Sequence, residues 1–229
     1  WGAYGCHPYV SLNYDETINS MFTLVHEMGH AMHSHYTWSN QPYVYGDYTI
    51  FVAEVASTVN EALLMEYLLK TTTDKNAGEY LINYFLEQFR GTLFRQTMFA
   101  EFELITHELV EKGETLTFDG LCKIYRELNV KYFGNNIVID DEIDREWARI
   151  PHFYNAFYVY QYATGYSAAI ALSQKILKEN GASDYLEFLK KGSSEYSIDL
   201  LKTAGVDMSV SKPIEDAMEV FKGLLDKIQ

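Results

Sequence analysis

Residues 18–36 have the sequence INSMFTLVHEMGHAMHSHY, in which apolar side chains recur at the spacing of an α-helix. Asp15 stands just before this stretch and is a suitable helix N-cap. The pattern predicts an amphipathic helix that extends to about residue 36 and carries the motif HEMGH at 26–30. Helical residues four apart lie one turn above each other on the same face. The helix therefore presents two imidazole rings side by side, with a carboxylate next to them.

The HEMGH motif matches the pattern His-Glu-x-x-His, in which both histidines bind one metal ion and the glutamate acts on a water molecule. We therefore predict that His26 and His30 are metal ligands and that Glu27 is a general base. The small Gly29 would allow another element to approach this helix closely. The structural alternative is a pair of half-buried histidines that hydrogen-bond to backbone carbonyls.

A catalytic zinc site needs a third protein ligand and an open position for water. In metzincins the third ligand is a histidine six residues after the second, a position that Tyr36 occupies here. Glu54 is the best remaining candidate, because it lies in the apolar stretch FVAEVAS of a helix predicted over about 48–70, with Asp47 as its cap. An unpaired carboxylate there would be unfavourable, and binding a divalent cation would offset that cost. Glu61 lies two turns further along, either as an acceptor for a ligand histidine or as a solvated acid.

A second unusual stretch, IPHFYNAFYVYQYATGY at 150–166, is rich in tyrosine. Four of these tyrosines are spaced by four residues and form one stripe on a helix predicted over 153–179: Tyr154, Tyr158, Tyr162 and Tyr166. A stripe of phenol rings is usually core or interface. Phenol and imidazole groups also stabilise the negative charge that develops on a carbonyl oxygen during amide hydrolysis. The residues alone leave both interpretations open.

The remaining sequence predicts a mainly α fold with a small β element near the N-terminus. Further helices are expected over about 77–111, with a break near Gly91, and over 116–133 and 140–149. The first 14 residues, WGAYGCHPYVSLNY, alternate apolar with small or polar residues, which predicts one or two short strands. His7 in this stretch either lines a cleft or is structural. The chain has four prolines and no linker-like segment, so we expect a single domain over 1–229.

The composition excludes several partners. Thirty-two acidic residues against 18 lysines and arginines give a net charge of −14, which argues against nucleic acid and against an anionic membrane surface. Two cysteines are too few for a disulfide framework, and no signal peptide pattern is present, so we expect a cytoplasmic protein. The sequence leaves the oligomeric state open.

Three stretches together resemble oligoendopeptidase F of the M3 family of zinc metallopeptidases: HEMGHAMHSHY at 26–36, QPYVYGDYTIFVAEVASTVNE at 41–61 and RIPHFYNAFYVYQYATGYSAA at 149–169. The resemblance covers most of the chain and is strongest over 1–66 and 145–170. Members of that family are much longer. The resemblance therefore implies that this chain is the C-terminal catalytic part of a longer oligoendopeptidase.

The resemblance implies a helical, zincin-type catalytic domain that holds one zinc ion per chain. The implied ligands are His26, His30 and Glu54, and the implied base is Glu27. His152 and one or more tyrosines would contact the oxyanion, and among the tyrosines we favour Tyr162. Further candidates for substrate binding are Tyr158, Tyr154 and His7, and the first segment would be the edge strand along which an extended peptide lies.

The predicted function is that of a zinc metalloendopeptidase that hydrolyses internal bonds of short peptides through a zinc-bound water. Two alternatives stay open. The chain is a zinc- and peptide-binding module without turnover, or it is an esterase or another metallohydrolase that uses the same ligands.

Overall fold

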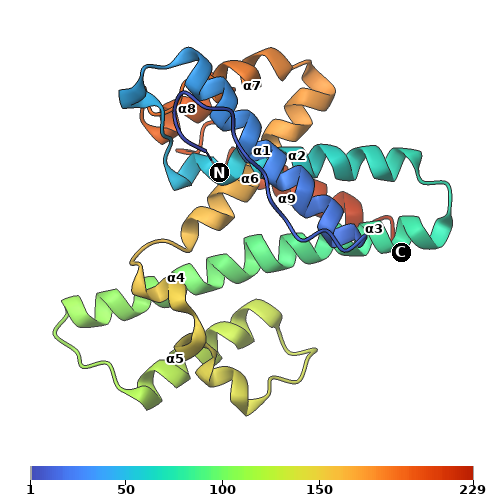
Figure 1. Cartoon of the computed structure of the whole chain (residues 1–229). Helices are drawn as coiled ribbons and strands as arrows, with labels where there is room; N and C mark the ends of the chain where they lie inside the picture. The colour runs from blue at the N-terminus through green and yellow to red at the C-terminus, as the bar shows by residue number, and fades with distance from the viewer. Residues whose placement is uncertain (1, 229) are drawn as a thin grey trace. The chain divides into compact units, whose positions relative to one another are not determined.

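The computed structural model describes residues 2–228 and is mainly helical, which confirms the predicted class (Figure 1). The chain divides into two compact units, one formed by residues 1–87 together with 164–229 and the other by residues 88–163. Within residues 2–228, no helix is long and apolar enough to cross a membrane. The α-helices are α1 (Ile18–Asn40), α2 (Ile50–Thr71), α3 (Lys75–Gln88), α4 (Arg95–Glu111), α5 (Phe118–Phe133), α6 (Tyr160–Glu179), α7 (Ala182–Leu189), α8 (Ser197–Thr203) and α9 (Lys212–Leu225).

The first unit contains the two helices on which the predicted metal ligands lie, α1 and α2, packed against each other. The N-cap of α1 is Thr17, whose side chain accepts a hydrogen bond from the backbone N–H of Ser20. Asp15, the predicted cap, instead accepts hydrogen bonds from the hydroxyl groups of Thr17 and Ser20. Helix α2 likewise begins after Thr49 rather than after Asp47. Both caps are displaced by two residues from their predicted positions, and both helices are present.

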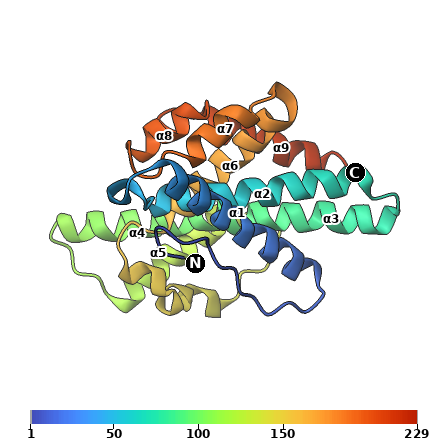
Figure 2. The same ribbon diagram turned by 45° about the horizontal axis from the view of Figure 1, so that its top comes forward.

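The core of the first unit lies on the side of α2 that faces α6, α7 and α8 (Figure 2). Small residues of α6 share one buried cluster with the valines of α2 and with larger residues of α7 and α8. The main core residues are Val52, Val55, Ala56, Val59, Ala168, Ala169, Leu172, Phe188, Leu189, Leu200, Leu201 and Val206. Burial of this apolar surface holds α2 in place, and with it Glu54.

The predicted β element is wrong, because residues 2–228 contain no strand. The N-terminal segment runs as an irregular chain antiparallel to α1 (Figure 1). A strand needs a second extended segment to pair its backbone N–H and C=O groups, and the neighbour here is a helix. The segment is held by side chains instead: the hydroxyl of Tyr4 donates to the carbonyl of Gln41, and the Tyr4 ring packs edge-on against Tyr43.

The second unit has a core of its own around α4 and α5. The π-helix η2 (Phe89–Phe94) precedes α4 and includes Gly91, where a helix break was predicted. Two 3-10 helices, η3 (Asp141–Arg149) and η4 (Pro151–Tyr154), follow α5. The core residues are Met98, Phe99, Phe102, Tyr125, Leu128, Ile150 and Val159.

Helix α6 begins at Tyr160, seven residues later than the predicted start at 153. Phe157 has a φ of 58°, in the left-handed region that a bulky side chain rarely adopts. Its backbone N–H donates to the buried carboxylate of Glu103 on α4, at 2.8 Å. This long-range hydrogen bond stabilises a turn where local spacing favours a helix. Tyr154 and Tyr158 therefore lie outside α6, and the predicted continuous stripe of four tyrosines does not form.

Candidate metal centre

The structure brings His26, His30 and Glu54 together, with one donor atom from each within 4.8 Å of the others. The Nε2 atoms of His26 and His30 lie 3.4 Å and 3.7 Å from Oε2 of Glu54. The two rings come from successive turns of α1 and the carboxylate comes from α2. All three side chains are between one quarter and one third exposed. The cluster is therefore shielded by protein yet open to solvent on one side.

Gly29 sets the distance between the two helices, as its small size predicted. A Cβ atom at this position would lie 2.5 Å from Cα of Ser57 and 2.7 Å from the carbonyl oxygen of Ala56. Both neighbours are backbone atoms of α2, so no side chain can move aside to make room. The bare backbone of α1 at Gly29 thus allows α2 to approach until Glu54 reaches the two rings.

Two further side chains contact the candidate ligands. Nδ1 of His26, the ring nitrogen that faces away from Glu54, lies 2.5 Å from Oε1 of Glu61. A carboxylate that accepts the second N–H of a histidine fixes the ring's orientation and its tautomer. The hydroxyl of Ser57 lies 3.3 Å from Oε2 of Glu54 and 3.0 Å from the Glu54 backbone carbonyl. Sequence reasoning gave Glu61 as one of two alternatives and did not find Ser57, since a buried serine carries no distinctive pattern.

The electrostatics of the cluster are dominated by two carboxylates, Glu54 and Glu61, which contact opposite nitrogens of the His26 ring. Burial opposes a charge on His26, but hydrogen bonds and charges from Glu54 and Glu61 outweigh it and raise the pKa of His26 to about 10. The hydrogen bond from His26 lowers the pKa of Glu54. Burial lowers the pKa of His30, although Glu54 partly opposes the shift. A cation placed among these groups would therefore meet an anionic carboxylate and would take the place of the proton on His26.

The donor set fits a divalent cation of the zinc type. Zinc takes imidazole nitrogen and carboxylate oxygen at about 2.0–2.2 Å in tetrahedral geometry, which puts neighbouring ligand atoms roughly 3.3–3.6 Å apart. The Nε2-to-Oε2 separations of 3.4 Å and 3.7 Å agree with that spacing. Two histidines and one glutamate complete three of four positions, which is the ligand count of catalytic rather than structural zinc.

A cavity of about 650 Å³ adjoins the cluster. It is lined by the candidate base Glu27, by the candidate ligands His30 and Glu54, and by other residues of the N-terminal segment, α1, the loop before α2 and α2 itself. The other lining residues are Gly2, Pro8, Ala31, Ser34, Trp38, Gly46, Asp47, Tyr48, Ile50 and Ala53. The volume is large enough for several residues of an extended peptide or for one long side chain.

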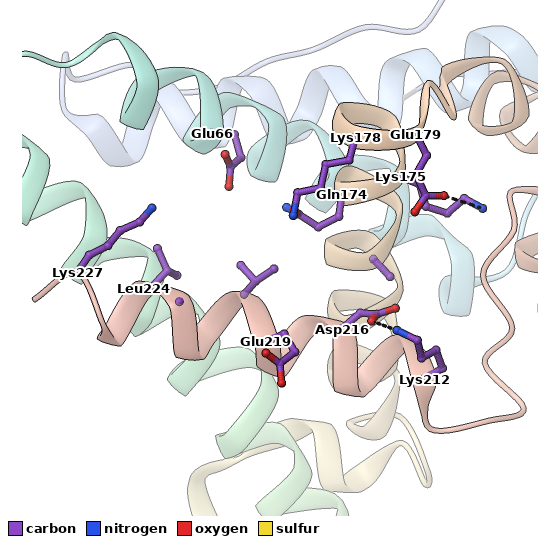
Figure 3. A pocket seen from close by; sticks show the side chains of 13 residues that line it. Glu66, Gln174, Lys175, Lys178, Glu179, Lys212, Asp216, Glu219, Leu224 and Lys227 are labelled. Carbon is purple, nitrogen blue, oxygen red and sulfur yellow. Dashed lines mark hydrogen bonds and ion pairs between the residues drawn. The ribbon is translucent and has the colours of Figure 1, made fainter.

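A second cavity of about 440 Å³ in the same unit lies between α2, α6 and α9 and contains none of the predicted ligands (Figure 3). Its charged side chains are lysines and acids in equal number, four of each: Lys175, Lys178, Lys212, Lys227, Glu66, Glu179, Asp216 and Glu219. Lys212 pairs with Asp216, and Lys175 lies 3.9 Å from Glu179. Such balanced, largely exposed charges give this cavity no single electrostatic preference. The cavity beside Glu54 is therefore the better candidate for substrate.

The predicted oxyanion residues belong to the second unit and form a cluster there. Nε2 of His152 lies 3.3 Å from the hydroxyl oxygen of Tyr162, which lies 3.5 Å from the hydroxyl oxygen of Tyr158. The rings of His152 and Tyr158 stack with centroids 5.5 Å apart. Tyr154 stands apart from this cluster, since its side chain is 92% exposed. The roles assigned to these four residues stay predictions.

The other histidines of the site region have structural contacts. His7 is exposed, and its ring packs against Tyr9, while Gly2 and Pro8 of the same segment line the cavity. His33 is 1% exposed and stacks flat on Tyr48 with ring centroids 3.7 Å apart. Burial lowers the pKa of His33 to about 3, so this ring is neutral.

Comparison with known proteins identifies the family of this chain. The model of peptidase family M3 matches residues 4–220. The chain belongs to peptidase family M3. Oligopeptidase PepF of Bacillus subtilis is 57% identical over the whole chain, and the oligoendopeptidase F homolog of Lactococcus lactis is 48% identical. Among solved structures, oligoendopeptidase-F from Enterococcus faecium is 48% identical, with a TM-score of 0.82 over 92% of this chain.

The family consists of metallopeptidases, and the His-His-Glu cluster is the group within residues 2–228 that could hold the metal ion. The chain spans about a third of the length of these relatives: 34% of the Bacillus subtilis protein and 38% of the Lactococcus lactis protein. The matched share of the Enterococcus faecium structure is also 38%.

Proposed function

We propose that this chain is the catalytic part of a zinc-dependent endopeptidase that hydrolyses internal bonds of short peptides. The observation that carries the proposal is the convergence of two imidazoles and one carboxylate at the edge of a 650 Å³ cavity that Glu27 also lines. When bound, zinc would supply Lewis-acid chemistry that activates water and polarises the scissile carbonyl at neutral pH. The relatives named as oligopeptidases and oligoendopeptidases support the choice of substrate.

The chain's own residues divide the remaining work. Glu27 accepts a proton from the attacking water and then donates it to the amine that leaves, so it acts first as a base and then as an acid. Glu61 holds the ring of His26 through Nδ1, which leaves Nε2 directed at the metal position. His152 and Tyr162 donate hydrogen bonds to the carbonyl oxygen as it gains negative charge. Tyr158, Tyr154 and His7 contact the bound peptide.

The test is the cleavage of a quenched fluorescent peptide by the zinc-loaded chain and by the variant Glu27→Gln. We expect the variant to bind one zinc ion with the affinity of the unmodified chain and to lose cleavage by at least a hundredfold, because a general base contributes about 10²–10⁴-fold. Glu111→Gln is the matched control, since Glu111 is an exposed glutamate near the end of α4. Cleavage by Glu27→Gln at the rate of the control would reject Glu27 as the base.

A second function, a zinc- and peptide-binding module without turnover, is favoured by one observation. The chain spans only 34% and 38% of the length of these two relatives, so most of each relative lies outside the matched part. A chain without all of the residues that position the scissile bond would bind the peptide but cleave it slowly, because much of the rate depends on that positioning. The module would be identified if the zinc-loaded chain binds the peptide but shows no chelator-sensitive cleavage of it.

A further inference from the structure

The cavity beside the metal ligands is lined by three acids and, within residues 2–228, by no lysine or arginine. These acids are Glu27, Asp47 and Glu54. Glu54 is committed to the histidine rings, and Glu27 is the proposed base. Asp47 is different: it is exposed, lies in the loop between Gly46 and Tyr48, and its carboxylate has no hydrogen bond or ion pair with another of the described residues. One carboxylate at the cavity therefore has no assigned role.

Tyr48, the neighbour of Asp47, forms a rigid aromatic wall of the cavity. Its ring lies flat on the buried ring of His33, with an interplanar angle of 7°. Its hydroxyl oxygen lies 2.9 Å from Oγ of Ser34, which also lines the cavity. Burial raises the pKa of Tyr48, and the hydrogen bond with Ser34 partly opposes this shift. The charges of Asp47 and Glu54 raise the pKa further. The negative charges of both acids therefore act on the same aromatic wall.

The lysines that follow α7 do not neutralise this charge. This segment touches the loop, since the side chain of Gln41 donates to the carbonyl of Lys190 and the N–H of Ser193 donates to the carbonyl of Tyr45. The ammonium groups are engaged elsewhere: Lys190 lies 2.6 Å from Glu187, and Lys191 lies 2.7 Å from Glu195. Neither lysine therefore pairs with Asp47.

We propose that this cavity receives a positively charged group of the peptide substrate and that Asp47 selects it. The inference rests on the proposed peptidase function and specifies its substrate class. The group is either a lysine or arginine side chain close to the scissile bond or the free amino terminus of a short peptide. The negative charge of Asp47 would attract a cation and disfavour an anion at the same position. The long apolar stem of a basic side chain also fits the faces of Tyr48 and Trp38, whose rings attract cations.

Binding measurements separate this inference from turnover. The protein is the zinc-loaded full chain with the substitution Glu27→Gln, and the probes are fluorescent peptides that differ at one residue, which is Lys, Gln or Glu. In the acetylated series, we expect the Lys peptide to bind about tenfold more tightly than the Gln peptide, a difference of about 1.4 kcal/mol, and the Glu peptide to bind more weakly than both. The second arm compares Gln peptides with free and with acetylated amino termini. A tenfold preference for the free terminus would identify that terminus as the cation.

Substitution of Asp47 tests the residue itself. Asp47→Asn should remove the tenfold preference, and Asp47→Lys should reverse it in favour of the Glu peptide. Asp119→Asn, which removes an exposed charge from the first turn of α5, is the control and should keep the preference. Equal affinities for all peptides, no binding of any peptide, or an unchanged preference in Asp47→Asn would each overturn the proposal. Cleavage is measured separately, in the zinc-loaded chain that keeps Glu27. Cleavage of all peptides by that chain at one rate would refute Asp47 alone. Preferential binding to Glu27→Gln with no cleavage by the chain that keeps Glu27 would refute the peptidase and leave Asp47 supported.

Discussion

The substitution Gly29→Ala tests whether the close crossing of α1 and α2 creates the metal site. The added methyl would lie 2.5 Å, 2.7 Å and 2.9 Å from three backbone atoms of α2: Cα of Ser57, the carbonyl oxygen of Ala56 and the amide nitrogen of Ser57. Carbon atoms pack favourably at about 3.5–4.0 Å. The helices must therefore separate by roughly 1 Å, since no side chain can rotate out of the way.

That displacement has two calculable effects. Forcing a methylene into a packed interface destabilises a protein by about 1–3 kcal/mol, and the better helix propensity of alanine offsets at most about 1 kcal/mol of it. The separation also moves Glu54 from 3.4 Å and 3.7 Å to roughly 4.5 Å from the two histidine nitrogens, beyond the spacing of a shared zinc ion. Loss of a residue that hydrogen-bonds to a metal ligand typically lowers metal affinity by about 10–100-fold. We expect Gly29→Ala to lower zinc affinity by more than this, because it displaces a ligand itself.

The assay is competition for zinc with a chromophoric chelator, combined with thermal unfolding of the metal-free chain. Gly78→Ala is the matched control, because Gly78 lies within α3 and a Cβ there meets nothing within 4 Å. The control should keep its zinc affinity and gain up to about 1 kcal/mol of stability. If Gly29→Ala binds zinc as tightly as the control does, the close approach of the helices is not what assembles the site.

Two further predictions concern the groups around the ligands and the core of the second unit. Glu61→Gln should weaken zinc binding by about 10–100-fold in the same competition assay, and an unchanged affinity would show that its contact with Nδ1 of His26 does not orient the ring. Burial opposes the charge of Glu146, but hydrogen bonds from Tyr125 and Arg95 and the nearby charge of Arg149 lower its pKa below 4.5. Its contribution to folding is therefore complete above that pH and is lost as the pH falls through the lowered value. Hydrogen exchange of the second unit should show that Glu146→Gln is less stable than the unmodified chain by about 3 kcal/mol at pH 7. This difference in stability should shrink in acid, where Glu146 is protonated. A difference that does not change with pH would refute the role of the Glu146 charge.

The proximity of the three candidate ligands was largely predictable, because it follows from local sequence. Helical geometry alone places His26 and His30 on one face, and the cost of a lone acid in an apolar stretch singles out Glu54. The structure brings these three side chains together. What the residues could not reveal is how closely the two helices cross, or that Asp47 lines the cavity instead of capping α2, since both depend on packing between segments.

The errors arose where distant parts of the chain override local preference. The alternation of residues 1–14 is typical of a strand, but a strand requires a partner, and this segment lies along a helix. The tyrosine spacing indicates a helix from 153, but the N–H of Phe157 bonds to Glu103, 54 residues away in sequence, and the chain turns there. No pattern within either segment contains that information.

The seven-residue spacing of Glu54 and Glu61 gives the metal cluster its asymmetry. Two turns of helix bring both carboxylates to one face of α2, and the ring of His26 lies between them, with Nε2 toward Glu54 and Nδ1 toward Glu61. His30 contacts Glu54 alone. Glu54 contacts Nε2, the nitrogen that would hold the metal, and Glu61 contacts Nδ1. The two acids therefore cannot exchange roles unless the His26 ring flips. Loss of Glu54 should therefore remove a ligand, whereas loss of Glu61 should leave all three ligands in place and free only the orientation of one ring.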